Sequence, residues 1–171
     1  GLDFAGDTGT QVHRDLGQTV KVVGGETDPT KLTTGNIGVV ADGTDKLTVQ
    51  LAKNINLGAD GSVQTGNTTV NNNGVTVDDG AGNSSTLTTA GTTVKNDQGQ
   101  EAVYGADKTE LKDGSNITTT TASGTTVTDG TSTTTVGADT ITVGAGSNPV
   151  VINGKDGVIT GLTNTTWDPN K

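Results

Sequence analysis

The stretch GNTTVNNNGVTVDDG, Gly66–Gly80, contains the residue pattern from which the predicted fold follows. Twice in this stretch a glycine is followed by short polar residues and a valine, and each valine precedes an Asn-rich or Asp-rich turn. Thr and Val are β-branched and favour the extended, half-buried surface of a strand. The stretch therefore predicts short strands joined by turns.

The same motif returns further along the chain as GTTV, at Gly91 and again at Gly124. Successive copies are separated by 8, 17 and 33 residues, which is an uneven spacing. We therefore expect a loose family of short strands and turns, without the strict period of a solenoid. One valine per strand is enough to line a narrow axis, but it is too little to fill the core of a sandwich.

Composition leaves the chain short of material for a core of its own. Only about 20% of the 171 residues are Leu, Ile, Val or Phe, a share at which strongly charged chains are usually disordered. However, 36 residues are Thr and only 3 are Pro, which favours β structure. A β-rich chain with few bulky side chains must find apolar surface in stacked repeats or in a partner chain. We therefore expect an all-β fold with little helix, and an oligomer.

Charge and cysteine content exclude several classes of partner and site. The net charge of −9 argues against nucleic acid and anionic membrane surfaces, because both select for Lys and Arg. It favours solubility and basic partners instead. The chain has no Cys, so neither a disulfide nor a thiolate site is available. The first residues, GLDFAGDTGT, read like the middle of a longer sequence, so we expect a fragment.

Three parts of the chain differ in composition and residue pattern, and we predict one module from each. Residues 1–58 include KLTVQLAKNINL, in which apolar residues alternate with polar ones from Leu47 onward and indicate a half-buried strand. Residues 59–142 contain the Thr- and Gly-rich motifs. Residues 143–171 are again rich in β-branched residues, as in VVINGKDGVITGLTN, and the single tryptophan, Trp167, follows this stretch.

Longer motifs carry a resemblance to a known family. LDFAGDTGTQVHRDLGQTVKVVGG, followed by NIGVVADGTDKLTVQLAKNINLG, resembles the Trp-ring head module of trimeric autotransporter adhesins. VVINGKDGVITGLTNTTWDP is similar to the segment that links such a module to the next one or to a neck. The whole chain resembles a receptor-binding region of the Haemophilus members of this family.

The resemblance implies a non-enzymatic surface fibre of a Gram-negative cell, anchored in the outer membrane by a part that lies outside this chain. It implies an intertwined homotrimer with β-prism-like modules around a threefold axis, in which three chains pool their sparse apolar residues. It also implies that the chain crosses its own pore before folding, which suits the lack of Cys.

The turn VTVDDGAGNSS is the main candidate for a binding site. Asp78 and Asp79 are followed by small residues, whose side chains cover little of the neighbouring backbone. Their carboxylates can therefore accept hydrogen bonds from a Lys or Arg side chain of a receptor. An ordinary Asp-Gly turn explains the same residues without a ligand. The resemblance implies an acidic pocket between neighbouring chains that uses an Asp, an Ala two positions later and a β-branched residue. The matching residues are Asp79, Ala81 and Ile117.

Two other groups of residues invite a functional interpretation. Trp167 can serve as a ligand platform, but three copies around an axis bury a large apolar area, so we interpret it as a structural plug on the trimer axis. His13, Arg14 and Asp15 suggest a catalytic group. Because adjacent side chains on a strand point to opposite faces, they cannot converge as a triad. We expect a solvated or intersubunit ion pair there.

The sequence predicts neither a metal site nor a cofactor. The Asp-Gly turn lacks the alternating oxygen ligands and the final Glu of an EF-hand. The glycine clusters lack the Lys and the helix of a phosphate-binding loop. Four Asn-X-Ser/Thr sequences are expected by chance in a chain so rich in Asn and Thr, and we assign them no role.

The preferred interpretation is a receptor-binding region that attaches bacteria to host epithelial cells through three equivalent acidic pockets. The receptor would be a protein or a glycoconjugate. The alternatives are a spacer module of the same fibre and a segment of a phage tail fibre. An enzyme such as a β-helical polysaccharide lyase would need converging charged groups and aromatic sugar platforms, and the chain has only three aromatic residues.

Overall fold

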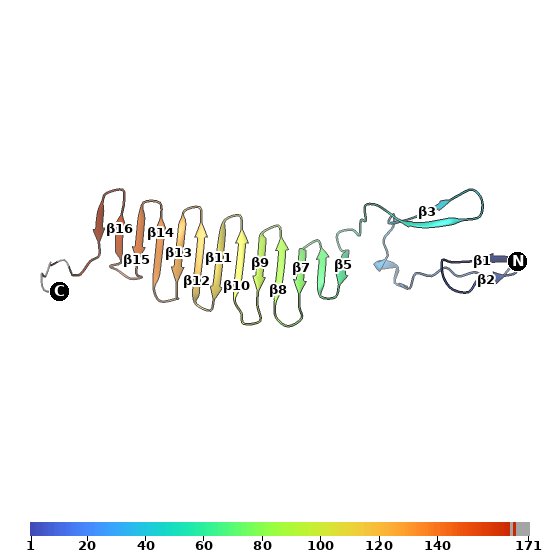
Figure 1. Cartoon of the computed structure of the whole chain (residues 1–171), viewed down its shortest axis with the longest axis horizontal. Coiled ribbons are helices and arrows are strands. Elements are labelled where there is room, and N and C mark those ends of the chain that lie inside the picture. The colour runs from blue at the N-terminus through green and yellow to red at the C-terminus, as the bar shows by residue number, and fades with distance from the viewer. Residues whose placement is uncertain (165, 167–171) are drawn as a thin grey trace. The chain divides into compact units, whose positions relative to one another are not determined.

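The computed structural model describes residues 1–164 and 166 (Figure 1). In that range the regular structure consists of seventeen strands and one short 3-10 helix, η1 (Pro29–Lys31), which confirms the predicted all-β class. None of the described helical residues forms a segment with the length and apolar character needed to span a membrane. The chain forms two compact units, Gly1–Asn56 and Leu57–Lys171. The division into modules 1–58, 59–142 and 143–171 stays a prediction.

The first unit contains two small antiparallel hairpins. Strand β1 (Leu2–Phe4) pairs with β2 (Val12–Arg14), and β3 (Ile37–Ala41) pairs with β4 (Leu47–Leu51). The second hairpin is closed by Asp42, whose Oδ1 accepts three backbone N–H groups of the turn at 2.9 to 3.2 Å. Aspartate favours such turns because its side chain bonds to backbone two residues further on.

Strand β4 is shorter than the sequence pattern predicts. The alternation of apolar residues continues beyond Leu51, but the strand ends there. The reason is Asn36, whose backbone carbonyl accepts the N–H of Ala52 at 2.9 Å and whose side chain bonds to the backbone of Asn56. These bonds hold the residues after Leu51 against the start of the hairpin instead of letting them extend the strand.

The second unit contains a single antiparallel sheet of thirteen strands in chain order, each hydrogen-bonded to the next (Figure 1). Its strands are β5 (Ser62–Thr65), β6 (Thr68–Asn71), β7 (Gly74–Asp78), β8 (Ser84–Thr88), β9 (Gly91–Lys95), β10 (Glu101–Gly105), β11 (Lys108–Asp113), β12 (Asn116–Thr121), β13 (Gly124–Thr128), β14 (Thr133–Gly137), β15 (Thr140–Val143), β16 (Val150–Asn153) and β17 (Val158–Thr160).

A two-strand unit repeats along this sheet. The first strands of successive units, β7, β9, β11, β13 and β15, begin 17, 17, 16 and 16 residues apart. The expectation of an uneven spacing is therefore wrong for this region. The third unit begins KTEL at Lys108 instead of GTTV, so the motif spacing of 33 residues spans two units and hides the repeat.

The two long edges of the sheet carry different turns. At one edge, which we call the acidic edge, the turns after β7, β9, β11 and β13 contain or begin with Asp79, Asp97, Asp113 and Asp129. At the other edge, which we call the alanine edge, the turns after β8, β10, β12 and β14 have two residues each. These turns contain Ala90, Ala106, Ala122 and Ala138.

One face of the sheet is apolar, and the strand register defines it. Side chains that alternate along a strand point to opposite faces, and residues paired across strands share a face. Two rows of paired residues therefore run along the apolar face. Ladder 1, nearer the alanine edge, consists of Val63, Val70, Val75, Leu87, Thr92, Tyr104, Thr109, Thr120, Thr125, Val136, Ile141, Ile152 and Ile159. Ladder 2, nearer the acidic edge, consists of Val77, Ser85, Val94, Ala102, Leu111, Thr118, Val127, Thr134, Val143 and Val150.

The opposite face is polar, and threonine dominates its central row. From β6 to β17 this row contains Thr69, Thr76, Thr86, Thr93, Val103, Glu110, Thr119, Thr126, Thr135, Thr142, Val151 and Thr160. Threonine pairs across strands stabilise a sheet and tolerate water on their exposed side. The polar face is therefore suited to solvent.

The described part of the chain has no hydrophobic core. None of its apolar side chains is buried, and residues in the middle of the apolar face such as Tyr104 and Leu111 each remain 54% exposed. Soluble monomers rarely expose apolar patches of this extent. The shortage of core material predicted from composition is confirmed, and the apolar face is the surface left without cover.

Candidate functional site

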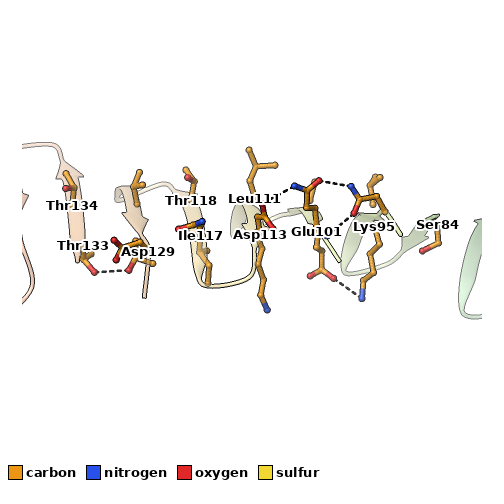
Figure 2. Close-up of a pocket in the computed structure, with 18 of the residues that line it drawn as sticks. Ser84, Lys95, Glu101, Leu111, Asp113, Ile117, Thr118, Asp129, Thr133 and Thr134 are labelled. Atoms are coloured by element: carbon orange, nitrogen blue, oxygen red, sulfur yellow. Dashed lines mark hydrogen bonds and ion pairs between the residues drawn. The ribbon is translucent and has the colours of Figure 1, made fainter. Parts of the chain in front are cut away.

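A groove of about 1190 Å³ runs along the apolar face from β7 to β15 (Figure 2). Its lining combines ladder 2 with turn residues of the acidic edge, which form its polar wall. The row next to ladder 2 on the opposite face, which includes Lys95, Glu101 and Ile117, also contributes to the lining. Figure 2 shows Leu111, Thr118 and Thr134 on one side of the sheet, while Lys95 and Glu101 point to the other side. The wall contains Asp79, Asn83, Asn96, Gln100, Asp113, Asn116, Asp129 and Ser132.

Asp79 is exposed at the acidic edge and holds its own turn together. Its Oδ1 accepts the backbone N–H groups of Ala81 and Asn83 at 2.8 and 3.0 Å, and its Oδ2 accepts the side-chain amide of Asn83. These hydrogen bonds, chiefly that from the Asn83 side chain and then that from the Ala81 backbone, lower the pKa of Asp79. The carboxylate is thus ionised, and part of its accepting capacity serves the turn.

The other predicted site residues do not converge on Asp79 within one chain. Asp78 Oδ1 accepts the backbone N–H of Gly80 at 2.6 Å, so it also supports the turn, and Ala81 is exposed. Ile117 lies on β12, five strands away from β7, which corresponds to about 24 Å at the usual spacing between strands. A site that combines Asp79 with Ile117 is therefore not formed within one chain, and the assignment stays a prediction.

Asp129 occupies an equivalent turn, which the sequence pattern marks as a turn but which was not among the predicted site residues. Its Oδ1 accepts the backbone N–H groups of Thr131 and Ser132 at 2.8 and 2.7 Å, and these bonds, Ser132 first, lower its pKa. The signal was present, because TDGTS contains the same Asp-Gly pair as DDGAG. What distinguishes the Asp79 turn is the second acid, Asp78, and the side-chain bond from Asn83.

Amide side chains connect neighbouring turns of the acidic edge. Gln100 Nε2 donates to Asp113 Oδ2 at 3.0 Å, and Asn96 Nδ2 donates to Gln100 Oε1 at 2.7 Å. The backbone N–H of Asp97 donates to Asn83 Oδ1 at 3.2 Å, which joins the first two turns. The wall of the groove is therefore a connected polar strip from Asp79 to Asp113.

The polar face contains two ion pairs that the sequence analysis did not anticipate. Lys95 Nζ lies 2.8 Å from Glu101 Oε2 across β9 and β10 (Figure 2), and Lys108 Nζ lies 2.8 Å from Glu110 Oε2. The hydrogen bond between Lys108 and Glu110 raises the pKa of the lysine and lowers that of the glutamate. Both pairs are partly exposed, so we assign them little stabilising effect.

His13 lies between two carboxylates, those of Asp3 and Asp15. Its Nδ1 lies 2.6 Å from Asp3 Oδ1 and its Nε2 lies 3.2 Å from Asp15 Oδ1, and these contacts, Asp3 first, raise the pKa of His13. Arg14 is turned elsewhere, because its Nε donates to the carbonyl of Thr19 at 2.9 Å. The ion-pair interpretation of this cluster agrees with the structure, with all partners from the same chain.

The remaining predictions concern the tryptophan and metals. Trp167 lies outside the described residues, so its place on a trimer axis stays a prediction. Within residues 1–164 and 166, no three acidic or histidine side chains come close enough together to hold a metal ion.

Comparison with known proteins gives one close likeness. Over 103 residues, 60% of its length, the chain is 42% identical to the trimeric autotransporter adhesin AtaA of Acinetobacter sp. (strain Tol 5). The match spans about 2% of that much longer protein. No family model matches the chain, and no solved structure matches it. The likeness, together with the all-β fold, supports the general class of trimeric autotransporter adhesins for this chain.

Proposed function

We propose that this chain is a receptor-binding region of a bacterial surface adhesin, and that it acts as a homotrimer without enzymatic activity. The observation that carries the proposal is the uncovered apolar face of the thirteen-stranded sheet. A surface of that kind belongs against other protein, because burial of apolar area is the main source of stability in folding and association. The similarity to a protein named as a trimeric adhesin supports three copies.

The proposed localisation follows from the same likeness. The chain is part of a passenger exposed outside the outer membrane, where it projects from the cell surface. The motifs that resemble a Trp-ring head and a linking segment support a modular fibre.

The proposed receptor site is the turn of Asp78, Asp79 and Ala81 at the acidic edge. Asp79 is exposed, its pKa is lowered, and the turn uses only part of its accepting capacity. Such a carboxylate is suited to a Lys or Arg of a receptor. Three equivalent sites on one fibre raise the effective concentration, so weak contacts gain a factor of ~10² to 10⁴ in avidity. We expect attachment to weaken with salt.

The test separates the charge of Asp79 from its role in the turn. Asp79→Asn removes the charge but keeps an oxygen that accepts the backbone N–H groups, whereas Asp79→Ala removes both. Asp129→Asn is the matched control, because Asp129 holds an equivalent turn on the same edge. We expect both Asp79 variants to lose saturable attachment to epithelial cells while remaining trimeric by light scattering, and Asp129→Asn to keep attachment. Unchanged attachment of Asp79→Asn contradicts the site.

A structural spacer in the same fibre is the second candidate, and one observation favours it. Asp79 and Asp129 form the same kind of turn, so the acidic edge is explained by local hydrogen bonding alone. Purified chain that shows no saturable binding to epithelial cells, although it is trimeric, supports the spacer over the receptor-binding region.

A further inference from the structure

The two ladders of the apolar face complement each other strand by strand. From β8 to β14, every strand except β12 gives one apolar or large side chain to one ladder and one small or hydroxyl-bearing side chain to the other. Ladder 1 takes the larger or more apolar residue in β8, β10 and β14, and ladder 2 takes it in β9, β11 and β13. The pairs, ladder 1 first, are Leu87 and Ser85, Thr92 and Val94, Tyr104 and Ala102, Thr109 and Leu111, Thr125 and Val127, and Val136 and Thr134.

The contrast is greatest on β10. This strand carries the only tyrosine of the chain, Tyr104, on ladder 1 and the smallest residue of ladder 2, Ala102. Tyr104 is 54% exposed. A well-packed interface alternates large and small residues across facing positions.

The apolar face also has two unlike halves. The half nearer the acidic edge borders the groove, whose lining includes ladder 2 from Val77 to Val143. Ladder 1 occupies the other half, nearer the alanine edge. An interface between unlike patches is head-to-tail, and such contacts close into a ring when the rotation between copies involves no shift along the axis.

We propose that ladder 1 of each copy packs into the groove over ladder 2 of the next copy. In this arrangement strands with the same number lie at the same height along the axis, which we call the same strand level, so that Tyr104 covers Ala102 of the neighbouring copy. This inference rests on the proposed homotrimer and adds the packing that closes it. A like-on-like arrangement places Tyr104 against Tyr104 and Ala102 against Ala102, which produces a clash at one position and a void at the other. Closure of the ring removes any shift along the axis, so residues of the same strand level meet.

The occupant of the groove is therefore a second copy of this chain. The groove repeats its features every two strands, because successive turns of the acidic edge come from successive two-strand units. The side chains of a ladder that fills the groove must also repeat every two strands, and this ladder must have a large side chain wherever ladder 2 has a small one. Ladder 1 of the same chain has both properties, which favours it over an unrelated peptide.

The experiment uses mixed trimers, because the natural chain contains no Cys. Chains carrying only Tyr104→Cys and chains carrying only Ala102→Cys are unfolded, mixed and refolded together, then treated with a bis-maleimide about as long as a tyrosine side chain. Cross-links within one chain are then impossible, since each chain has a single thiol. We expect the mixture to give covalent dimers at several-fold higher yield than either variant alone.

An off-level pair is the control for register. Val136→Cys lies on ladder 1 of β14, four strands from β10, or about 19 Å away. Its mixture with Ala102→Cys is expected to give no more cross-linking than the single variants. A second same-level pair, Leu87→Cys with Ser85→Cys, repeats the test on β8 in case loss of the tyrosine prevents refolding.

The outcomes separate this inference from the proposed function. Equal yield from Tyr104→Cys alone indicates a like-on-like contact and overturns the inference, as does equal yield from the off-level mixture. A trimer by light scattering without same-level cross-linking overturns the packing but not the trimer. A natural chain that remains a folded monomer overturns the proposed trimer, and this inference with it.

Discussion

Gly124 and Gly137 face each other across β13 and β14, but only Gly124 is required to be glycine. Gly124 has a φ of 147°, and a Cβ placed on it would lie 2.2 Å from the carbonyl oxygen of Val136. A Cβ on Gly137 would meet nothing closer than 3.7 Å. The alanine edge can therefore turn within two residues at this point only because β13 begins without a side chain.

The first prediction follows from this pair. Gly124→Ala should destabilise the sheet by about 1 to 3 kcal/mol, because the substitution combines a strained φ with a backbone clash. Gly137→Ala is the matched control on the partner strand and should change the free energy of unfolding by less than about 0.5 kcal/mol. Denaturant unfolding of both variants measures the difference, and equal effects would show that the close approach at Gly124 is not required.

The second prediction concerns the pair of hydrogen bonds between Asn36 and Asn56. Asn36 Nδ2 donates to the carbonyl of Asn56 and Asn36 Oδ1 accepts its N–H, both at 2.8 Å, and Asn36 is the one buried polar residue of the described chain. Asn36→Asp removes the donor and should cost about 1 to 3 kcal/mol. Hydrogen exchange at the Asn56 N–H should accelerate accordingly. Asn54→Asp, at an exposed position nearby, should leave this exchange rate unchanged.

The third prediction is a pH dependence at His13. Contacts with Asp3, and secondarily with Asp15, raise the pKa of His13 above its ordinary value of 6.5. A raised pKa in the folded state means that the stabilisation is complete below pH 6.5 and is lost as the pH rises through the folded pKa. The β1–β2 hairpin should therefore be better protected from hydrogen exchange at acidic pH.

Asp3→Asn is the variant that tests the cause. It should bring the pKa of His13, measured by NMR titration, back toward the ordinary value and flatten the pH dependence of the hairpin. Asp7→Asn changes the same charge in the loop that joins β1 and β2 and should have a much smaller effect. If His13 of the natural chain titrates at its ordinary pKa, the contact with Asp3 does not form in solution.

The fourth prediction uses the repeat. Removal of residues 91–107, which contain β9, β10 and the turn after each of them, joins Ala90 to Lys108 and preserves the alternation of edges and faces. This shortened chain should keep its β circular dichroism and its oligomeric state by light scattering. Removal of residues 91–99 takes out a single strand and reverses the direction of every later strand. That variant should lose cooperative unfolding.

The sequence predicts the class of structure because that class depends on local properties. Thr and Val favour strands wherever they stand, the Asp-Gly and Asn-Gly pairs mark turns, and the shortage of bulky residues excludes a core within one chain. The turn at Asp79 was recognised for the same reason. Its two interpretations, a receptor site or a plain turn, remained open because each depends on what faces the carboxylate, and that is not a local property.

The tertiary structure alone decided which residues act together. A shift of one residue in register moves every side chain of a strand to the other face, so the ladders follow from turn lengths and not from any single motif. The repeat was hidden because one of its units lacks the glycine motif, and the separation of Asp79 from Ile117 appears only when the strands between them are placed side by side. Local residue preferences are enough to predict strands and the lack of a core, whereas the pairing of those strands sets which face is left to be covered.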